Sequence, residues 1–497
     1  MKKYLKSWIA ILGCVLVFSC SNYLDVQPED KLLESIVFSN ESSIHAALNN
    51  VYSSMASDNI YGGNLTMTTV DVLAQRYSTL EDLQPRFWHR YGIYDYDDSV
   101  VQGGFNAIWS NMYINILNIN NFISGLDTYE GALSEEKKNL LKGEAIALRA
   151  MHHFDLLRLF GPIYSENPEA DAIPYNTEAK AELTAILPAT KVMELILADL
   201  AIAEGLLEND PIREFGKIAI LEEDVEPEDP EFDYNGSDFY RFRNLRLNYF
   251  AVKALQARAN LYAGDNIAAL AAAKTVINEA SKWFAWTDPL DVISAGKKAD
   301  RIFSSEVLFA VQNNNLYNQY DRFFSDELGQ RFVLTSNSAR LETVFEANLN
   351  DYRFNSTWAV PSIGGFDTKT FFKFVEISVG PGEAEVGFKF MQPLVRISEM
   401  YYIAAEAELD ATLALGYLNT VRFNRGLIDL PADVDINVEL LKEYEKEFYG
   451  EGQLFFYYKR HNFSTIPDGS SDSGTVDMNV STYVVPLPLS ETNFRND

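Results

Sequence analysis

The chain has 497 residues, with 71 acidic and 41 basic side chains and a net charge of −30 at pH 7. Phosphate binding needs a cationic face, so a surface this acidic excludes nucleic acid as a ligand and disfavours acidic polysaccharides. Aromatic residues make up 13% of the chain, and aromatic side chains are well suited to binding sugars or peptides through their ring faces.

The start of the chain has the pattern of an export signal. Three lysines precede an apolar run from Trp8 to Phe18, which is shorter than the roughly 20 residues that a membrane-spanning helix needs. A small residue, Ser19, follows the run, as in a secretory leader. The sequence Val-Phe-Ser-Cys that ends at Cys20 resembles the lipobox of bacterial lipoproteins, in which the cysteine is acylated and becomes the new N-terminus. We therefore predict a leader over residues 1–19 and lipid attachment at Cys20, with plain secretion as the alternative.

The rest of the chain, residues 20–497, is predicted to be a single domain without disulfides. Both cysteines, Cys14 and Cys20, lie in or beside the leader, so an exported fold must be stabilised by its core alone. The chain is long enough to bury such a core. No second apolar run approaches membrane-spanning length, so the predicted contact with the membrane is the lipid anchor only.

Helical periodicity dominates this domain. Apolar spacing and end signals predict helices over residues 105–123, 135–160, 190–208, 245–263, 266–280, 395–409, 411–424 and 437–449. The pair over 245–280 is close to the ~34-residue unit of tetratricopeptide repeats, and the pair over 395–424 follows the same pattern. The sequence therefore predicts a mainly α fold with a tetratricopeptide-like scaffold.

Two long segments, residues 61–104 and 281–394, lack this periodicity and are rich in aromatic residues. Loops this long in a compact fold are usually functional or disordered, and the aromatic content argues against disorder. Strand-like runs at 306–312 and 368–378 predict one small β-hairpin. The acidic stretch 221–239 is predicted to be a solvated loop. Residues 468–477 are predicted to form a polar loop, with calcium binding as the alternative.

The sequence lacks the common catalytic motifs. It contains no zinc-binding His-Glu-x-x-His helix, no phosphate-binding loop, no Gly-x-Ser-x-Gly elbow and no dinucleotide fingerprint. His152 and His153 lie within a strong helix and are interpreted as packing or surface residues. A carboxylate pair for glycoside cleavage is not marked among the 71 acidic residues, so no catalytic residue, metal ligand or cofactor is predicted.

Several motifs, taken in order, resemble the SusD/RagB-like surface lipoproteins of Bacteroidetes. They are the opening "CSNYLDVQPED", the Trp-x3-Tyr-x2-Ile-x3-Asn helix at Trp109, Tyr113, Ile116 and Asn120, "GEAIALRAMHHFDLLRLFGP", "RISEMYYIAAEAEL" followed by Asn419, Arg422, Arg425 and Gly426, "EYEKEFYGEGQLFFYYKR", and the C-terminal "YVVPLPLSETNFRN". The chain departs from the family pattern at His153, Leu454 and Tyr457. These departures put the class of ligand in doubt more than the fold.

The resemblance implies about four helix pairs with loops on one face. It further implies a lipid-anchored protein of the outer membrane at the cell surface. Such a protein captures a nutrient, most often an oligosaccharide or polysaccharide, and passes it to a SusC-like TonB-dependent transporter. Oligopeptides are the ligand in the RagB-like branch. A surface glycoside hydrolase and a scaffold that only docks proteins are further alternatives.

Charged residues within these motifs are interpreted as scaffold residues. Charges on apolar helical stripes tolerate burial only when they are paired. We therefore expect structural ion pairs at Glu144, Arg149, Arg158, Glu399, Glu406, Glu447, Glu451 and Arg460.

The ligand-binding residues are predicted from ring density in the loops. An aromatic ring stacks on the C–H face of a sugar while neighbouring polar groups bind its hydroxyls. Trp88, Tyr91, Tyr94 and Tyr96 form a first predicted platform. A second comprises Trp283, Trp286, Tyr317, Tyr320 and Trp358. The alternative for each ring is that it packs its loop onto the scaffold.

Overall fold

The computed structural model describes residues 34–81, 86–217, 238–293, 298–362, 365–378 and 386–495. The predicted leader and Cys20 lie outside these residues, as does most of the acidic stretch 221–239. The described part of the chain is mostly helical with a few short strands, which confirms the predicted fold class.

The helices are α3 (Glu41–Met55), α4 (Thr69–Leu73), α5 (Arg86–Gly92), α6 (Ser99–Thr128), α7 (Glu135–Phe160), α8 (Ala189–Leu206), α9 (Ile212–Phe215), α10 (Tyr249–Ala263), α11 (Asn266–Ala280), α12 (Pro289–Ile293), α13 (Leu316–Phe323), α14 (Ser338–Val344), α15 (Tyr352–Thr357), α16 (Ile397–Ala407), α17 (Ala411–Phe423), α18 (Ile436–Glu447), α19 (Leu454–His461), α20 (Val480–Tyr483) and α21 (Leu489–Thr492). The strands are β1 (Asp171–Pro174), β2 (Ile186–Pro188), β3 (Val307–Gln312), β4 (Trp358–Ala359), β5 (Thr370–Phe371), β6 (Met391–Arg396), β7 (Thr465–Pro467) and β8 (Thr475–Asp477).

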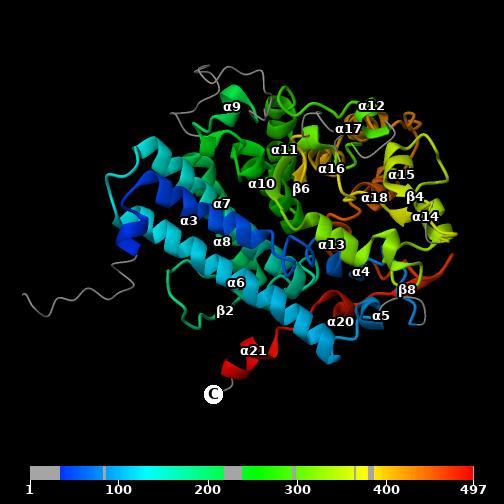
Figure 1. The fold of residues 1–497 in the computed structure, drawn as a ribbon, viewed down its shortest axis with the longest axis horizontal. Coiled ribbons are helices and arrows are strands. Elements are labelled where there is room, and N and C mark those ends of the chain that lie inside the picture. The colour runs from blue at the N-terminus through cyan, green and yellow to red at the C-terminus, as the bar shows by residue number, and fades with distance from the viewer. Residues whose placement is uncertain are drawn as a thin grey trace, which may run out of the picture.

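Eight of the described helices form the scaffold, each packed against the next in the order α3, α6, α7, α8, α10, α11, α16 and α17. Figure 1 shows α3, α6, α7 and α8 running side by side, with α10, α11, α16 and α17 continuing the succession away from them. The order gives the four helix pairs that the resemblance implies. Each helix buries a stripe against both neighbours, as in repeat scaffolds whose stability comes from contacts between successive units.

Local signals in the sequence start and end these helices. Asp265 and Asp410 accept hydrogen bonds from backbone N–H groups in the first turns of α11 and α17, which satisfies donors that have no partner within the helix. Gly264 ends α10 with φ +84°, a left-handed conformation that glycine adopts without strain. The turn between α10 and α11 is thus fixed by the Gly-Asp pair that the sequence placed there.

The strands form four two-stranded antiparallel sheets. The predicted hairpin between 306–312 and 368–378 is wrong, because β3 pairs with β6, and β5 pairs with β4. Strand β6 is buried along its whole length and runs directly into α16. Because both faces of β6 are buried, including its polar residues Gln392 and Arg396, it has no alternating apolar pattern, so the sequence did not reveal it as the partner of β3.

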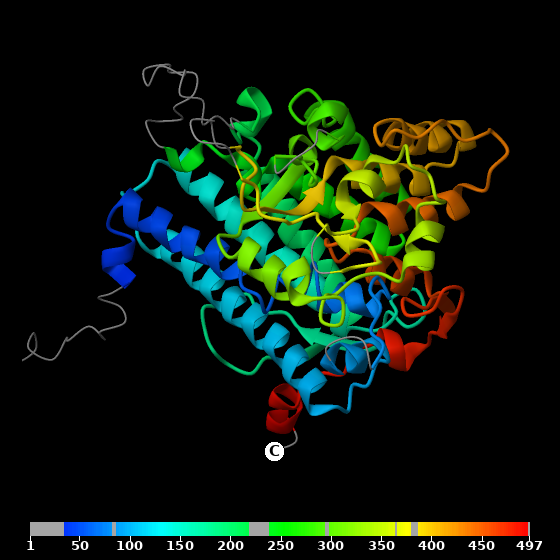
Figure 2. The ribbon, with the colours of Figure 1, turned by 45° about the vertical axis from the view of Figure 1, so that its right-hand side comes forward.

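The two long insertions gather on one side of the scaffold, together with the β7–β8 hairpin. Ser78 donates a backbone hydrogen bond of 2.8 Å to the carbonyl of Thr335, and the Thr79 N–H donates to Ser470 Oγ at 2.9 Å. Figure 2 shows the segments of the second insertion lying over the helices on this side. We call this side the loop face.

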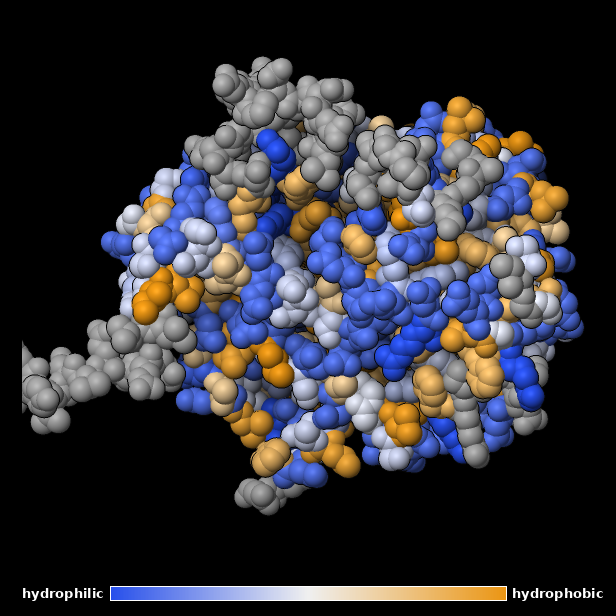
Figure 3. Space-filling model, viewed as in Figure 1, coloured by the Kyte–Doolittle hydropathy of each residue, from blue (hydrophilic) through white to orange (hydrophobic). Residues whose placement is uncertain are grey.

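The described residues contain no helix that is both long and apolar enough to cross a membrane. Figure 3 shows hydrophilic side chains over most of one face of the molecule, with apolar side chains in separate small areas. The apolar side chains that do cluster are in one continuous core beneath the loops and between the helices.

Candidate ligand-binding site

Three rings of the first predicted platform are buried beneath the loop face. Trp88, Tyr91 and Tyr94 are 3%, 5% and 8% exposed. The Trp88 and Tyr91 ring centroids lie 5.7 Å apart, and the Tyr94 hydroxyl donates to the carbonyl of Leu73 at 2.7 Å. Burial raises the pKa of Tyr91 to about 12. These contacts are those of rings that pack a loop onto the scaffold.

Tyr96 is the member of this platform that keeps part of its ring at the surface. It is half-buried, its hydroxyl donates to the carbonyl of Thr482 at 2.7 Å, and its ring meets the Phe105 ring edge-on at 5.6 Å. The hydrogen bond and the edge-on contacts with Phe105 and Tyr94 fix the ring direction, and part of the residue remains exposed. Stacking of a ligand on Tyr96 stays a prediction.

The second predicted platform does not come together. Tyr320 and Trp358 are each 3% exposed, and the Trp358 ring packs on Phe371 at 5.0 Å. Trp283, Trp286 and Tyr317 are half-buried, and the ring partner of Trp286 is Tyr401 rather than another member of the platform. The structure therefore distributes these five rings over separate places instead of one surface.

A hollow of about 500 Å³ opens beside Tyr96, and we call it the Tyr96 hollow. One wall is the start of α6 and the residues before it; the other is the C-terminal segment before and within α21. Figures 1 and 2 both show α21 beside the N-terminal half of α6. The lining residues are Tyr96, Asp97, Ser99, Gln102, Gly103, Phe105, Asn106, Val485, Pro486, Leu487, Pro488, Leu489 and Ser490.

The first wall is positioned by the cap of α6. Asp98 accepts hydrogen bonds from the N–H groups of Val100 and Val101 at 2.8 and 3.4 Å, which starts the helix at Ser99. Gln102 is exposed and Asn106 half-buried, one helical turn apart and on the same side of the helix. The cap thus presents two side-chain amides to the hollow.

The second wall is held by hydrogen bonds to distant elements. The N–H of Val485 donates to the carbonyl of Leu159 at the end of α7, at 3.4 Å. Tyr483 donates from its hydroxyl to the carbonyl of Phe463 at 2.9 Å, and Ser490 Oγ donates to Asn106 Oδ1. The two walls are therefore joined directly, by the contact between Ser490 and Asn106.

The walls combine apolar surface with hydrogen-bonding groups that are neutral apart from the carboxylate of Asp97. Tyr96, Phe105 and the two prolines supply apolar area, and the amides and hydroxyls supply donors and acceptors. Ligand pockets of a few hundred Å³ with a few polar groups on a mostly apolar lining are typical of small-molecule sites. This hollow suits a short saccharide better than a charged ligand.

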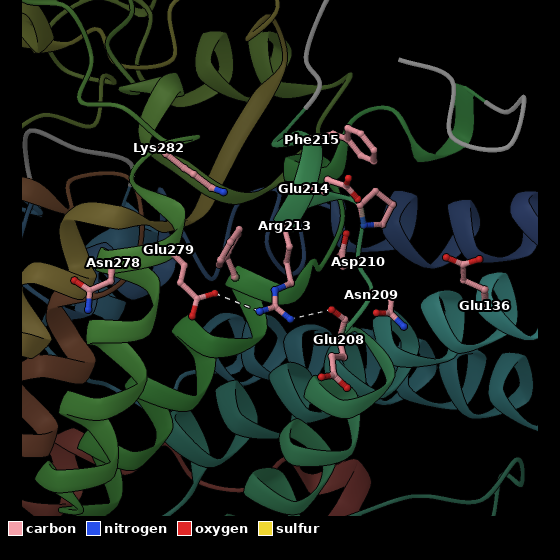
Figure 4. A pocket seen from close by; sticks show the side chains of 12 residues that line it. Glu136, Glu208, Asn209, Asp210, Arg213, Glu214, Phe215, Asn278, Glu279 and Lys282 are labelled. Carbon is pink, nitrogen blue, oxygen red and sulfur yellow. Dashed lines mark hydrogen bonds and ion pairs between the residues drawn. The ribbon is translucent and has the colours of Figure 1, made fainter. Parts of the chain in front are cut away.

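A second, larger hollow of about 850 Å³ lies where α8 ends and α9 begins, beside α11 (Figure 4). We call it the acidic basin; its lining residues are Glu136, Glu208, Asn209, Asp210, Pro211, Arg213, Glu214, Phe215, Phe250, Asn278, Glu279 and Lys282. Trp283 lies next to the basin, where its indole N–H donates to the carbonyl of Arg213 at 3.4 Å.

Two of the charged groups in the basin already form ion pairs with other side chains of the protein. Arg213 donates to the Glu208 carbonyl at 2.9 Å, pairs with Glu279 at 3.4 Å and lies 4.2 Å over the Tyr249 ring. Asp210 is fully buried and pairs with Arg243 at 2.8 Å. The basin is therefore the weaker candidate, because these groups already have partners and the wall is mostly exposed charge.

The charged motif residues form structural ion pairs, as predicted. The pairs are Glu144 with Arg243, Arg149 with Asp199, Arg158 with Asp155, Glu399 with Arg258, Glu406 with Arg460, Glu447 with Arg353, Arg396 and Arg425, and Glu451 with Lys373 and Arg396. Three arginines hold the pKa of the Glu447 carboxyl well below its usual range, against the effect of its burial. None of these residues lines the Tyr96 hollow.

His152 and His153 are buried, as the packing interpretation requires. Each ring contacts the carbonyl oxygen four residues earlier through Nδ1, at 2.7 and 2.9 Å. Within the described residues, no group of three or more His, Cys, Asp or Glu side chains is placed to hold a metal ion. Residues 468–474 of the predicted polar loop connect β7 to β8, and residues 475–477 form β8 itself.

Sequence reasoning missed most of the Tyr96 hollow. Gln102 and Asn106 lie on the polar side of α6, and the C-terminal "VVPLPLS" segment was used only as a family motif. The sequence signal that could have indicated this wall is the pair of prolines, Pro486 and Pro488, followed by Ser490 near the end of the chain. Nothing in the sequence showed that this segment returns to the start of α6.

The fold defines a class: a helical repeat scaffold with long insertions on one side, here with a hollow between the start of α6 and the C-terminal segment. Comparison with known proteins is more specific. Residues 22–219 match the family model SusD-like_3, described as starch-binding associating with outer membrane. A SusD-like protein P2 of Formosa agariphila is 28% identical over 208 residues, which cover 42% of this chain and 38% of that protein. The match thus spans less than half of the relative's length.

Solved structures share the fold over nearly the whole chain. A SusD superfamily protein of Bacteroides thetaiotaomicron superposes with a TM-score of 0.68 at 20% identity, covering 91% of this chain and 97% of that one. A laminarin-binding SusD-like protein superposes with a TM-score of 0.62 at 18% identity, covering 91% and 97%. At these identities the structures establish the fold, and together with the family model and the relative they confirm the SusD/RagB-like resemblance.

Proposed function

We propose that this protein is a cell-surface lipoprotein that binds a glycan in the Tyr96 hollow and delivers it to a TonB-dependent outer-membrane transporter. The observation that carries the proposal is the hollow itself, in which a half-buried ring, Tyr96, and the side-chain amides of Gln102 and Asn106 face the C-terminal segment Val485–Ser490. The family description as starch-binding and the laminarin-binding structural relative support the same ligand class. The proposal includes no catalytic step, since the conspicuous charged residues are held in buried ion pairs.

The hollow favours a saccharide over an extended peptide. Peptides that add to a binding surface as strands use its backbone N–H and carbonyl groups. Pro486 and Pro488 remove two N–H donors from the C-terminal wall, so that wall offers few of the partners a peptide backbone needs. The oligopeptide-binding alternative is therefore the second candidate.

The ligand test uses the soluble body, residues 21–497, in calorimetric titrations against neutral and acidic oligosaccharides and a peptide pool. Gln102→Ala and Asn106→Ala each remove an amide from the hollow, and each is expected to weaken glycan binding about two- to ten-fold, since a lost hydrogen bond is worth roughly 0.5–1.5 kcal/mol. Gln312→Ala is the matched control, because Gln312 is exposed on β3 and does not line the hollow. Unchanged affinity in both hollow variants would remove the site, and heat from peptides alone would favour the second candidate.

The anchoring and delivery steps are tested separately. Cys20→Ala in the full-length chain is expected to abolish metabolic incorporation of labelled fatty acid and to release the protein from the membrane. Retained labelling would contradict lipid attachment at this residue. Delivery predicts co-purification of the anchored protein with an outer-membrane transporter in its native host, and a preparation free of any transporter would contradict that step.

A further inference from the structure

We infer that the Tyr96 hollow selects neutral saccharides over glycans that carry carboxylate or sulfate groups, with Asp97 as the residue that determines this selectivity. The inference rests on the proposed function and names the chemical class of its ligand. It follows from the charges that line the hollow and from the ion pairs that the arginines near it already form.

The lining has one charged side chain. Among the described residues around the hollow none is lysine or arginine, and Asp97 is the one acid. Asp97 is exposed and forms no ion pair or hydrogen bond with the described residues. Its carboxylate therefore remains free to accept a hydrogen bond from a sugar hydroxyl and to repel an anionic substituent.

Arginines on the neighbouring segments are already paired. Arg90 in α5 contacts Asp95 at 3.1 Å and Asp98 at 4.0 Å. Arg495, which follows α21, pairs with Glu491 and donates to the carbonyl of Thr184. Neither guanidinium lines the hollow, so an acidic sugar would have to break an existing pair to gain a cation.

The positive end of α6 is also unavailable to an anionic ligand. A helix N-terminus attracts anions through its free N–H groups and its dipole. In α6 the N–H groups of Val100 and Val101 donate to the carboxylate of Asp98. The chain thus places its own anion where an acidic ligand would otherwise bind.

The remaining polar groups match uncharged hydroxyls. Ser490 donates to Asn106 Oδ1, which leaves the Asn106 amide nitrogen to donate outward. Gln102 offers a donor and an acceptor at the open side of the hollow. Sugar hydroxyls both donate and accept, so they satisfy these groups without a charge.

The test measures the affinity of the soluble body for neutral probes (maltoheptaose, laminarihexaose and cellohexaose) and for acidic probes (alginate- and pectin-derived hexauronates) at low salt. Wild type is expected to bind at least one neutral probe and to bind the acidic probes at least ten-fold more weakly. Asp97→Lys reverses the charge and is expected to tighten acidic-probe binding about ten-fold. Asp97→Asn is expected to fall between wild type and Asp97→Lys.

Asp433→Lys is the matched control, since it makes the same charge change at an exposed position outside the hollow. Acidic probes that bind wild type as tightly as neutral ones, or that gain nothing from Asp97→Lys, would overturn the inference while leaving glycan capture intact. An equal gain from Asp433→Lys would also overturn it, because the effect would then come from net charge. If no probe binds, both the proposed glycan function and its selectivity fail.

Discussion

The Nζ of Lys459 donates a hydrogen bond to the carbonyl oxygen of Leu159, at 3.2 Å, in the last turn of α7. A second bond, of 2.8 Å, goes to the Gly161 carbonyl. The same Leu159 oxygen accepts from the N–H of Val485 in the wall of the Tyr96 hollow. One buried lysine therefore satisfies the end of a scaffold helix and shares its acceptor with the segment that walls the Tyr96 hollow.

Burial of Lys459 makes stability depend on pH. It lowers the pKa of this amine from 10.5 to about 7, so between these values the unfolded chain binds the proton and the folded protein does not. The free energy of unfolding is therefore expected to rise as the pH increases from about 7 towards 10.5. This contribution is lost as the pH falls back over the same interval, and it is gone once the pH is below about 7. Thermal unfolding of wild type and Lys459→Met at pH 7 and 9 measures this contribution.

The difference between the two proteins isolates the lysine from other groups that titrate. Wild type is expected to gain stability relative to Lys459→Met on going from pH 7 to pH 9. Parallel curves over this interval would show that Lys459 does not titrate there.

Glu447 pairs with three buried arginines, which also pair with other carboxylates, so Glu447→Gln is expected to be strongly destabilising. Its carboxylate contacts Arg353 at 2.9 Å and Arg425 at 2.7 Å, and it also pairs with Arg396. Breaking a buried pair by removing one partner costs about 3–5 kcal/mol. Urea unfolding gives the change in the free energy of unfolding.

Glu279→Gln is the control for Glu447→Gln. It breaks the Arg213–Glu279 pair, whose side chains are 34% and 44% exposed, and exposed pairs contribute roughly 0–1 kcal/mol. Similar losses in both variants would contradict a special role for burial. A folded Glu447→Gln protein is also expected to keep its glycan affinity, since the residue is structural.

His153 is expected to make the fold sensitive to acid. Its Nδ1 contacts the Arg149 carbonyl at 2.9 Å and its Nε2 accepts from the Asn176 N–H at 3.0 Å, so the neutral ring fits both partners. Burial lowers its pKa from 6.5 to about 3. Stability present above pH 6.5 is therefore lost as the pH falls, because the unfolded chain takes up the proton first.

His153→Tyr removes this titration while keeping a ring and a polar group. The drop in unfolding temperature between pH 7 and pH 5 is expected to be smaller in the variant than in wild type. An identical drop would assign the acid sensitivity to other groups, among them His152, whose pKa burial lowers to about 4.

Gly103 and Gly104 form a matched pair in α6. A Cβ on Gly104 would collide with the hydroxyl of Tyr91, whereas a Cβ on Gly103 meets nothing within 4 Å. Gly104→Ala is therefore expected to destabilise the protein by about 1–3 kcal/mol. Gly103→Ala is expected to stabilise it by roughly 0.5–1 kcal/mol, because alanine restricts the unfolded chain and favours the helix.

Urea unfolding of the two alanine variants compares them directly. Equal effects on the free energy of unfolding would mean that the Tyr91 ring moves aside at little cost and does not hold α5 in place. Gly103 lines the Tyr96 hollow. Gly103→Ala is therefore also expected to reduce the volume of the hollow and to weaken glycan binding.

The rings illustrate why the candidate site was only partly predictable. Trp88 and Tyr91 are three residues apart in α5, which puts them on one side of a helix, and that spacing is as typical of a buried stripe as of a platform. Tyr96 differs from them because it follows the helix and is anchored through Thr482, a residue 386 positions away. Ring density pointed to a region that includes Tyr96 and its hollow, while the exposure of each ring depended on distant contacts.

The sequence by itself determined seven of the eight scaffold helices and the pairs α10–α11 and α16–α17, but not α3, because apolar periodicity, caps such as Asp265 and turns such as Gly264 are local signals. Six separated motifs also carried the family resemblance. Tertiary structure alone decided that β3 pairs with β6 rather than with the strand-like run before it, and that Pro486–Ser490 lies against the start of α6. The second of these contacts joins residues 384 positions apart, the first joins strands in separate parts of the chain, and the stability of both comes from shared burial and hydrogen bonds that no short segment contains.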